Sequence, residues 1–350
     1  MSPRIPVSVL GATGTVGQRL VALLDGHPRF EVVSLVASSR SAGRAYGEVV
    51  QWRLSGEPPA SLARIEVTAA GDPPAEGVRL ALSSLDSGVA RDTEERFARA
   101  GVMVVSNASP HRMVEDVPLV VPEVNGAHLA LLDAQERYPD GGGIVCNPNC
   151  STIGLVLALA PLHRAFGVEA VDVTTLQAAS GAGYPGVSSM DLIDNVVPLI
   201  PGEEEKLAEE PAKILGRLAG RSIESAVLEI SAQCFRVPVT DGHTASVSVR
   251  LGRRPDSAEE LVRTWAAFAA EHGGDGEPPL VISEAPDRPQ PRLDRDAGTG
   301  MAATIGRVRR CPVLGWRFVV LSHNTIRGAA GGTLKIAEAL VAGGRFRAGG

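Results

Sequence analysis

A cysteine near the middle of the chain has the surroundings expected of an enzymatic nucleophile. Cys150 follows Asn147-Pro148-Asn149 and stands at the start of a helical pattern over residues 151–166. The positive end of a helix dipole lowers the pKa of a thiol at that position and raises its thiolate fraction. Asn149 could direct its side-chain amide at the oxyanion that forms when this thiolate attacks a carbonyl. The sequence therefore indicates covalent catalysis at Cys150.

The other three cysteines give no comparable signal. Cys146, Cys234 and Cys311 are interpreted as buried, small apolar residues. Cys146 and Cys150 are spaced like a metal-binding pair, but no second cluster along the chain completes such a site, so we predict no metal centre. Four cysteines in 350 residues also do not make a disulfide framework.

A thiolate nucleophile needs a proton partner, and seven histidines are available. Four of them lie in amphipathic or polar stretches and are expected to be solvated: His27, His128, His163 and His272. His243 stands in a polar turn at the edge of two predicted strands. Periodicity alone does not select His243 over His111 or His323.

A glycine-rich turn near the start of the chain predicts a dinucleotide site. Residues 11–17 have the spacing GxxGxxG, follow a strand pattern over residues 7–10 and open a helical pattern over residues 16–24. Glycines permit the tight turn, and the N–H groups at the helix start can bind a pyrophosphate. The residues expected to contact the cofactor here are Gly11, Thr13, Gly14, Thr15 and Val16.

The end of the second strand pattern indicates which dinucleotide binds. An NAD site usually places a carboxylate there for the ribose 2′-hydroxyl. This chain instead has Ser38, Ser39 and Arg40, whose hydroxyl and guanidinium groups suit a 2′-phosphate. We therefore expect NADP.

The elements that must position these residues fall into two groups. Short apolar runs alternate with helical patterns up to residue 149, which is typical of a doubly wound parallel sheet of the Rossmann type. Longer alternating runs follow at residues 170–177, 225–235, 245–251 and 317–321 and predict a mostly antiparallel sheet with one covered face. We expect an α/β protein with an NADP-binding domain (residues 1–149 and 331–350) and an α+β substrate and dimerisation domain (residues 150–330).

Composition excludes several classes of function. Lys and Arg number 34 and Asp and Glu number 40, so the net charge is −6 and a nucleic-acid partner is not expected. The longest apolar stretch, residues 152–160, is far shorter than the roughly 20 residues that span a bilayer. With no secretory leader before the first strand, we predict a cytoplasmic protein without a membrane partner.

Eight segments, in this order, resemble the aspartate-semialdehyde dehydrogenase family, and most closely its archaeal and fungal branch. They are GATGTVG, SNASPHRM, NPNCST, QAASGAGYPG, IPGEEEK, FRVPVTDGHT, RPQPRLDRDAGTGMA and HNTIRGAAGG. The resemblance implies NADPH-dependent reduction of β-aspartyl phosphate to aspartate semialdehyde and phosphate, on the route to lysine (through diaminopimelate), threonine and methionine. It also implies a homo-oligomer, a dimer or tetramer formed through the second sheet.

The resemblance also assigns roles to individual residues. It makes Cys150 the nucleophile that forms a thioester and His243 its acid–base partner, with Gln177 orienting the acyl group. Arg236 would bind the substrate carboxylate and Glu203 its amino group, while Arg112 and Lys206 would bind the phosphate. Ser84, Gly181 and Asn324 would complete the cofactor site.

Two other functions remain open at this stage. A related acyl reductase acting on malonyl-CoA or N-acetyl-glutamyl phosphate would share the nucleophile and the architecture. From a different class, a catalytically inactive NADPH-binding protein would share the fold alone.

Overall fold

The computed structural model describes residues 3–139, 141–273 and 276–346, and it contains two six-stranded sheets. The first sheet has the order β3-β2-β1-β4-β5-β6, and all of its strand pairs are parallel. Its strands are β1 (Ile5–Leu10), β2 (Phe30–Ala37), β3 (Val67–Ala69), β4 (Leu80–Ser83), β5 (Met103–Ser106) and β6 (Gly143–Cys146). The strand order reverses direction between β1 and β4, which is where doubly wound sheets bind ligands.

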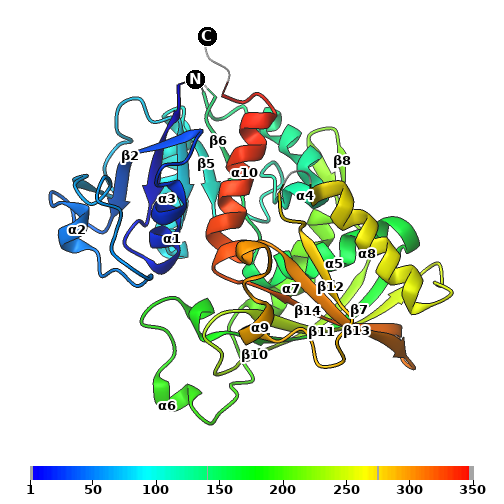
Figure 1. The fold of residues 1–350 in the computed structure, drawn as a ribbon. Coiled ribbons are helices and arrows are strands. Elements are labelled where there is room, and N and C mark those ends of the chain that lie inside the picture. Colours follow the sequence, from blue (N-terminus) through cyan, green and yellow to red (C-terminus); the bar gives the residue numbers. More distant parts are fainter. Residues whose placement is uncertain (1–2, 140, 274–275, 347–350) are drawn as a thin grey trace.

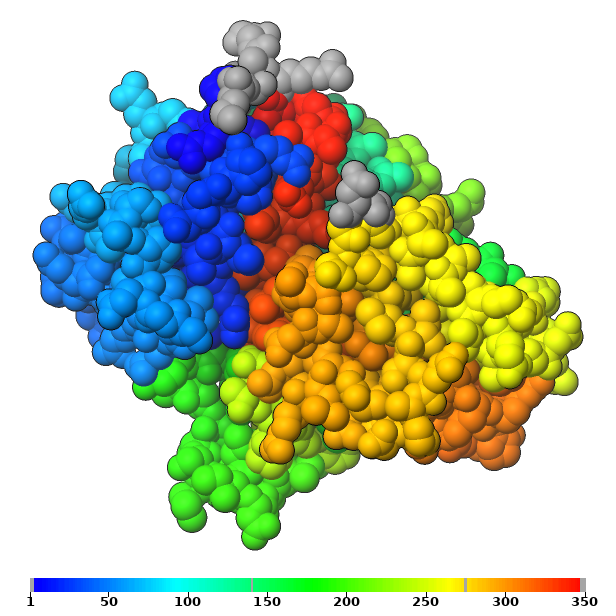
Figure 2. Space-filling model, viewed as in Figure 1, coloured from blue at the N-terminus to red at the C-terminus, as the bar shows by residue number. Residues whose placement is uncertain are grey.

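Helices cover both faces of this sheet (Figure 1). The longer ones are α1 (Thr15–Leu24), α3 (Ser87–Arg99) and α10 (Gly331–Ala342), and shorter turns are α2 (Tyr46–Val49), α4 (Pro122–Asn125) and a 3₁₀ segment (Gly126–Ala134). α10 comes from the far end of the chain, yet Ile336, Ala337 and Leu340 belong to the same apolar core as Val9 and Leu20. In Figure 2 this last segment, in red, lies against the blue N-terminal segment.

The second sheet has the order β10-β7-β11-β14-β13-β12. Its strands are β7 (Val168–Gln177), β10 (Glu229–Arg236), β11 (His243–Leu251), β12 (Leu280–Ser283), β13 (Ala303–Cys311) and β14 (Gly315–Ser322). The three central pairs are antiparallel and the two outer pairs are parallel. Together the two sheets confirm the predicted fold class.

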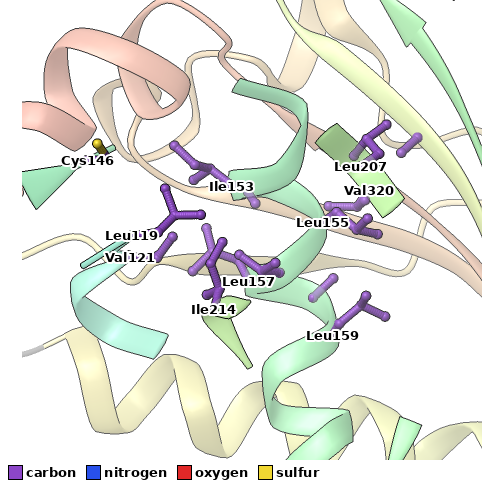
Figure 3. Close-up of a cluster of buried hydrophobic side chains, with 14 of the residues drawn as sticks. Leu119, Val121, Cys146, Ile153, Leu155, Leu157, Leu159, Leu207, Ile214 and Val320 are labelled. Carbon is purple, nitrogen blue, oxygen red and sulfur yellow. The ribbon is translucent and has the colours of Figure 1, made fainter. Parts of the chain in front are cut away.

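One face of the second sheet is covered by three helices: α5 (Cys150–Phe166), α7 (Glu203–Ile214) and α8 (Ala258–Gly273). Trp265 of α8 is fully buried; its ring packs edge-on against Phe318 and its indole N–H donates to the Ala158 carbonyl at 2.8 Å. Figure 3 shows apolar side chains gathered around α5, among them Ile153, Leu155, Leu157, Leu159, Leu207, Ile214 and Val320. This packing fixes the N-terminus of α5, and with it Cys150.

Several elements differ from the sequence prediction. The strand expected at residues 225–235 begins only at Glu229, because the preceding residues leave a separate hairpin formed by β8 (Arg217–Ala219) and β9 (Ser222–Glu224). The sequence patterns do not predict β3, β6, β12, β13 or the two strands of this hairpin. The remaining short elements are α6 (Ser189–Leu192), α9 (Pro291–Asp294), two 3₁₀ segments (Ala179–Ala182 and Ala297–Gly300) and a π-helical turn (Ile326–Ala330). No helix in the described ranges is both long and apolar enough to cross a membrane.

Candidate active site

A cleft of about 340 Å³ lies where the two sheets meet, and it contains most of the residues predicted to act. Its lining comes from the glycine turn, the ends of β4 and β5, the start of α5, α7 and the segment after β14. The predicted site residues that line it are Thr15, Val16, Ser84, Arg112, Asn149, Cys150, Gly181, Glu203, Lys206 and Asn324.

Asn149 begins α5 and fixes the position of Cys150. Its side-chain oxygen accepts hydrogen bonds from the N–H groups of Ser151 (2.9 Å) and Thr152 (3.3 Å), as a helix N-cap does. Its amide nitrogen donates to both carboxylate oxygens of Glu203 at 2.9 Å. We expected the Asn149 amide to point at an oxyanion, but the structure directs it at Glu203 instead. Cys150 is in the first turn of α5, so its N–H has no carbonyl four residues back in the helix to donate to. This N–H is therefore available to stabilise the oxyanion.

Cys150 lines the cleft, and the buried His243, which does not line it, is in contact with Cys150. The Cys150 Sγ lies 3.3 Å from the His243 Nε2, and the Ala178 N–H donates to the His243 Nδ1 at 3.0 Å. Because Nδ1 accepts a hydrogen bond, the proton of the neutral ring is on Nε2 and points at the sulphur. Burial, aided by the charge of Arg236, lowers the pKa of His243 to about 3, so the ring is neutral.

The thiol itself is surrounded by groups that act in opposite directions. Burial, followed by the carboxylate of Glu203, raises the pKa of Cys150 to about 12. The cations Arg112, Arg236 and Lys206 lower it. Burial therefore outweighs the lowering of the Cys150 pKa that the helix N-terminus predicts.

One end of the cleft carries groups suited to an amino acid. Arg236 is buried, and its Nη1 donates to the Ala178 carbonyl at 2.8 Å. Glu203 accepts from the Lys206 Nζ (2.8 Å) and from the Gln177 amide (3.2 Å). Although burial opposes it, Lys206 and the neighbouring amides lower the pKa of Glu203, which is therefore a carboxylate. The arrangement offers one cation and one anion beside the nucleophile.

The other end carries Arg112, on the loop after β5. Its Nη1 donates to the Glu210 carboxylate at 2.9 Å and its Nη2 to the Asn107 carbonyl at 2.6 Å. Its Nε is buried and has no hydrogen-bond partner among the described residues. Arg112 lines the cleft, and a guanidinium held in place by two hydrogen bonds is suited to an anion such as phosphate.

Sequence reasoning missed two residues of this site, Glu210 and Lys213. Both are buried, and Lys213 donates to three carbonyls, those of Arg112 (2.8 Å), Val114 (2.7 Å) and Val117 (2.8 Å). With Glu203 and Lys206 they occupy helix positions separated by three, four and three residues, which places all four on one face of α7. That spacing is the signal that could have identified them.

The cofactor side is formed largely by backbone. Gly11 has a φ of 79°, and an added Cβ would lie 2.8 Å from the Ser84 carbonyl oxygen; at Gly17 it would lie 2.1 Å from the Gly11 carbonyl oxygen. These close approaches keep the turn open toward the N-terminus of α1, as a pyrophosphate requires. Beyond it, the Asn324 amide donates to Ser180 Oγ at 2.8 Å.

The remaining predicted cofactor residues, Ser38, Ser39 and Arg40, follow β2 and are exposed. Because β2 pairs in parallel with β1, they lie at the same sheet edge as the glycine turn. They do not line the cleft around Cys150. This position suits contact with the adenosine ribose rather than with the reacting end of a dinucleotide.

The other histidines lie away from the nucleophile. His111 Nε2 is 3.5 Å from a Glu94 oxygen, and His323 Nε2 is 3.9 Å from Asp296. His128, expected to be solvated, is buried, with its ring nitrogens 2.9 Å from the Asn125 amide and 3.2 Å from the Gly216 carbonyl. That expectation is wrong because the 3₁₀ segment carrying His128 packs against the β8–β9 hairpin. In the described part of the chain, no three or more His, Cys, Asp or Glu side chains gather in a metal-binding arrangement.

Comparison with known proteins finds similar proteins along nearly the whole chain. The semialdehyde dehydrogenase NAD binding domain matches residues 6–132, and the semialdehyde dehydrogenase dimerisation domain matches residues 159–327. Aspartate-semialdehyde dehydrogenase of Archaeoglobus fulgidus is 48% identical over 339 residues, covering 97% of this chain and 98% of that protein. The Candida albicans enzyme is 45% identical over 357 residues, covering 95% and 97%.

Solved structures agree in fold. The Candida albicans aspartate semialdehyde dehydrogenase with NADP has a TM-score of 0.88 at 42% identity, covering 98% of this chain and 100% of that one. The Vibrio cholerae aspartate semialdehyde dehydrogenase II complexed with ASA has a TM-score of 0.78 at 28% identity, covering 97% and 99%.

Proposed function

The chain belongs to the aspartate-semialdehyde dehydrogenase family, as its motifs predict, and from this premise we propose that it works through a thioester on Cys150. It is an NADP-dependent oxidoreductase of amino-acid biosynthesis that converts β-aspartyl phosphate into aspartate semialdehyde and phosphate. The observation that carries the proposed mechanism is the 3.3 Å contact between Cys150 Sγ and His243 Nε2 at the start of α5, among three cations.

In the first step the Cys150 sulphur attacks the carbonyl carbon of the acyl phosphate. The oxyanion is stabilised by the Cys150 N–H. The bond from carbon to the phosphate oxygen then breaks, and the leaving phosphate is held by Arg112 and Lys206. The products of this half-reaction are a thioester on Cys150 and hydrogen phosphate, which carries away the proton of the thiol.

In the second step NADPH, when bound, supplies a hydride to the thioester carbonyl. The resulting alkoxide reforms a C=O bond as the C–S bond breaks, which gives the aldehyde and the Cys150 thiolate. The His243 Nε2–H donates to that thiolate and stabilises it as it leaves. For His243 to transfer a proton fully to the thiolate, the ring would first have to be an imidazolium, and its protonated Nδ1 would then have to give up the Ala178 N–H.

The charged ends of the substrate match the charges of the cleft. We assign its carboxylate to Arg236 and its amino group to Glu203, while Gln177, beside Glu203, orients the acyl group. Binding of the ammonium group would also offset the Glu203 charge that raises the pKa of Cys150. The substrate therefore helps to form the thiolate that attacks it.

The cofactor site fits NADP. The glycine turn leaves its N–H groups and the start of α1 open to the pyrophosphate, and Ser38, Ser39 and Arg40 supply donors for a 2′-phosphate. Ser84, Gly181 and Asn324 lie on the route from that turn to Cys150 and would contact the nicotinamide end.

We further propose that the enzyme is a homo-oligomer joined through the uncovered face of the second sheet. On this face Asp172 and Glu229 lie on β7 and β10, while Arg250 and Arg317 lie on β11 and β14. A two-fold axis would bring the acidic strands β7 and β10 of one copy onto the basic strands β11 and β14 of the other. The sequence match to a dimerisation domain supports this pairing. The cytoplasmic location stays a prediction.

The proposed reaction is tested by phosphate-dependent reduction of NADP with aspartate semialdehyde, comparing wild type with Cys150→Ala. We expect wild-type turnover that requires phosphate, and a loss of roughly 10⁴-fold or more in the variant. Turnover that survives in Cys150→Ala would refute the thioester. A wild type that is inactive here but oxidises NADPH with malonyl-CoA would keep the mechanism and overturn the substrate.

A further inference from the structure

Glu210 connects the Arg112 guanidinium to the backbone directly before the nucleophile Cys150. One carboxylate oxygen accepts from the Arg112 Nη1 at 2.9 Å, and the other accepts from the backbone N–H of Asn149 at 2.7 Å. All three residues are buried; the Glu210 side chain is 2% exposed. A single carboxylate thus joins the guanidinium of the anion site to the residue directly before the nucleophile.

The chemistry of the two partners requires a carboxylate at this position. Both the Arg112 guanidinium and the Asn149 N–H are donors, so both oxygens of residue 210 must accept. A glutamine has one accepting oxygen and one donating amide, and would place an N–H₂ group against one of the two donors. In a buried site such a donor–donor contact leaves both groups unsatisfied.

The same helix face secures the loop that carries Arg112. The Lys213 Nζ donates to the carbonyls of Arg112, Val114 and Val117, so this loop is held by an ammonium while the guanidinium is held by Glu210. In the first turn of α7, Glu203 and Lys206 line the cleft. α7 therefore contributes two side chains toward the substrate and two that hold the anion site in place.

We propose that Glu210 is a positioning residue that holds Arg112 at a fixed distance from Cys150, so that the phosphate and the attacked carbonyl of one substrate meet both groups at once. The inference rests on the proposed function, because it concerns how phosphate binds at that same site. Glu210 acts through Arg112 and Asn149 and does not itself contact the reacting atoms. Its loss should weaken phosphate use while leaving cofactor binding intact.

The test compares Glu210→Gln with the matched control Glu209→Gln. Glu209 is the preceding residue on α7, is exposed, and contacts neither Arg112 nor Asn149. Kinetics are measured with aspartate semialdehyde, NADP and inorganic phosphate. For Glu210→Gln we expect the KM for phosphate to rise by about tenfold or more, since a hydrogen bond to a charged group is lost. The KM for NADP should change by less than about twofold, because the cofactor side is separate. Glu209→Gln should match wild type in both.

A second variant distinguishes positioning from general damage. Glu210→Asp keeps the charge but withdraws the carboxylate by one methylene, and it should raise the phosphate KM less than Glu210→Gln does. If both variants are folded and their phosphate KM equals that of wild type, the inference is overturned while the proposed function stands. If neither variant folds, Glu210 has only a structural role and the inference is again overturned. Absence of phosphate-dependent turnover in wild type and Glu209→Gln alike would overturn the proposed function itself.

Discussion

The two sides of the cleft are built in different ways. On the substrate side, Arg112, Glu203 and Arg236 are all buried and hydrogen-bonded to other groups of the protein. On the cofactor side, the glycine turn presents backbone, and Arg40 is an exposed side chain at a strand end. A small, highly charged substrate must be placed precisely at one sulphur atom, so its binding groups are fixed in advance. The larger dinucleotide can rely on backbone geometry and a few adaptable contacts.

The largest effect should come from adding one methyl group at Gly181, where the predicted nicotinamide site meets the buried groups of the substrate side. At Gly181 a Cβ would lie 2.6 Å from the Arg236 Nη1 and 2.9 Å from the His243 Cε1. We expect Gly181→Ala to reduce kcat/KM for aspartate semialdehyde by about 10²-fold, because small displacements of fixed groups cost that much. Steady-state kinetics measure it.

The control on the cofactor-binding domain is Gly88→Ala in α3, where a Cβ meets no atom within 4 Å. It should leave activity unchanged and stabilise the fold by about 0.5 to 1 kcal/mol, since alanine is the better helix former. If Gly181→Ala and Gly88→Ala lost activity equally, the contrast between a rigid substrate side and an adaptable cofactor side would be wrong.

A smaller effect is expected at Arg40. Removing its guanidinium in Arg40→Ala should raise the KM for NADP by about tenfold, because one charge-assisted contact to the 2′-phosphate is lost. The KM for NAD, which lacks that phosphate, should not change. Measuring both cofactors side by side checks this, and a similar rise for both would show that Arg40 does not recognise the 2′-phosphate.

The smallest effect on activity is expected at a buried carboxyl that lacks the kind of partner Glu210 has, and its ionisation is measured through the stability of the fold. Glu94 of α3 accepts from the hydroxyls of Ser83 (2.6 Å) and Ser106 (2.7 Å), and its other oxygen faces His111. Burial raises the pKa of Glu94 to about 7, against the effect of the two hydroxyls. A carboxyl with a raised folded-state pKa stabilises the protein most fully below its unfolded pKa, and this contribution is lost as the pH rises through about 7.

Glu94→Gln removes this titration and should therefore gain stability relative to wild type between pH 5 and pH 8, by about 2 to 3 kcal/mol. Thermal unfolding of both proteins across that range measures the difference. A difference that stays constant with pH would show that Glu94 is ionised in the fold throughout.

The sequence predicts the fold well where an apolar pattern is long or where glycines mark a turn. The turn at residues 11–17 and the helix starting at Cys150 have strong local signals, and the structure forms both. β6 and β12 have only four residues each, too few for an alternation to be recognised. β13 was missed because arginines interrupt its apolar positions, and its Arg307 has a φ of 57° at an irregularity in the pairing with β14.

For the site, residue types could be predicted more easily than contacts. Cys150 and His243 come within 3.3 Å, but the orientation of Asn149 could not be foreseen, because it depends on Glu203 from a helix more than 50 residues away. Glu210 and Lys213 look like ordinary solvated helix charges in the sequence. Their role depends on burial, which is a property of the assembled domain and not of α7 alone.

The return of α10 to the first sheet has a consequence for how the protein is made. The apolar positions around Val9 and Leu20 are covered by α10, which leaves the ribosome only after the entire second domain has been synthesised. Until then the N-terminal domain lacks part of its core and has apolar surface open to water. The polypeptide also crosses between the domains twice, so no single cut yields an intact cofactor-binding fragment. Translation order thus makes this N-terminal domain one of the last parts of the molecule to be completed.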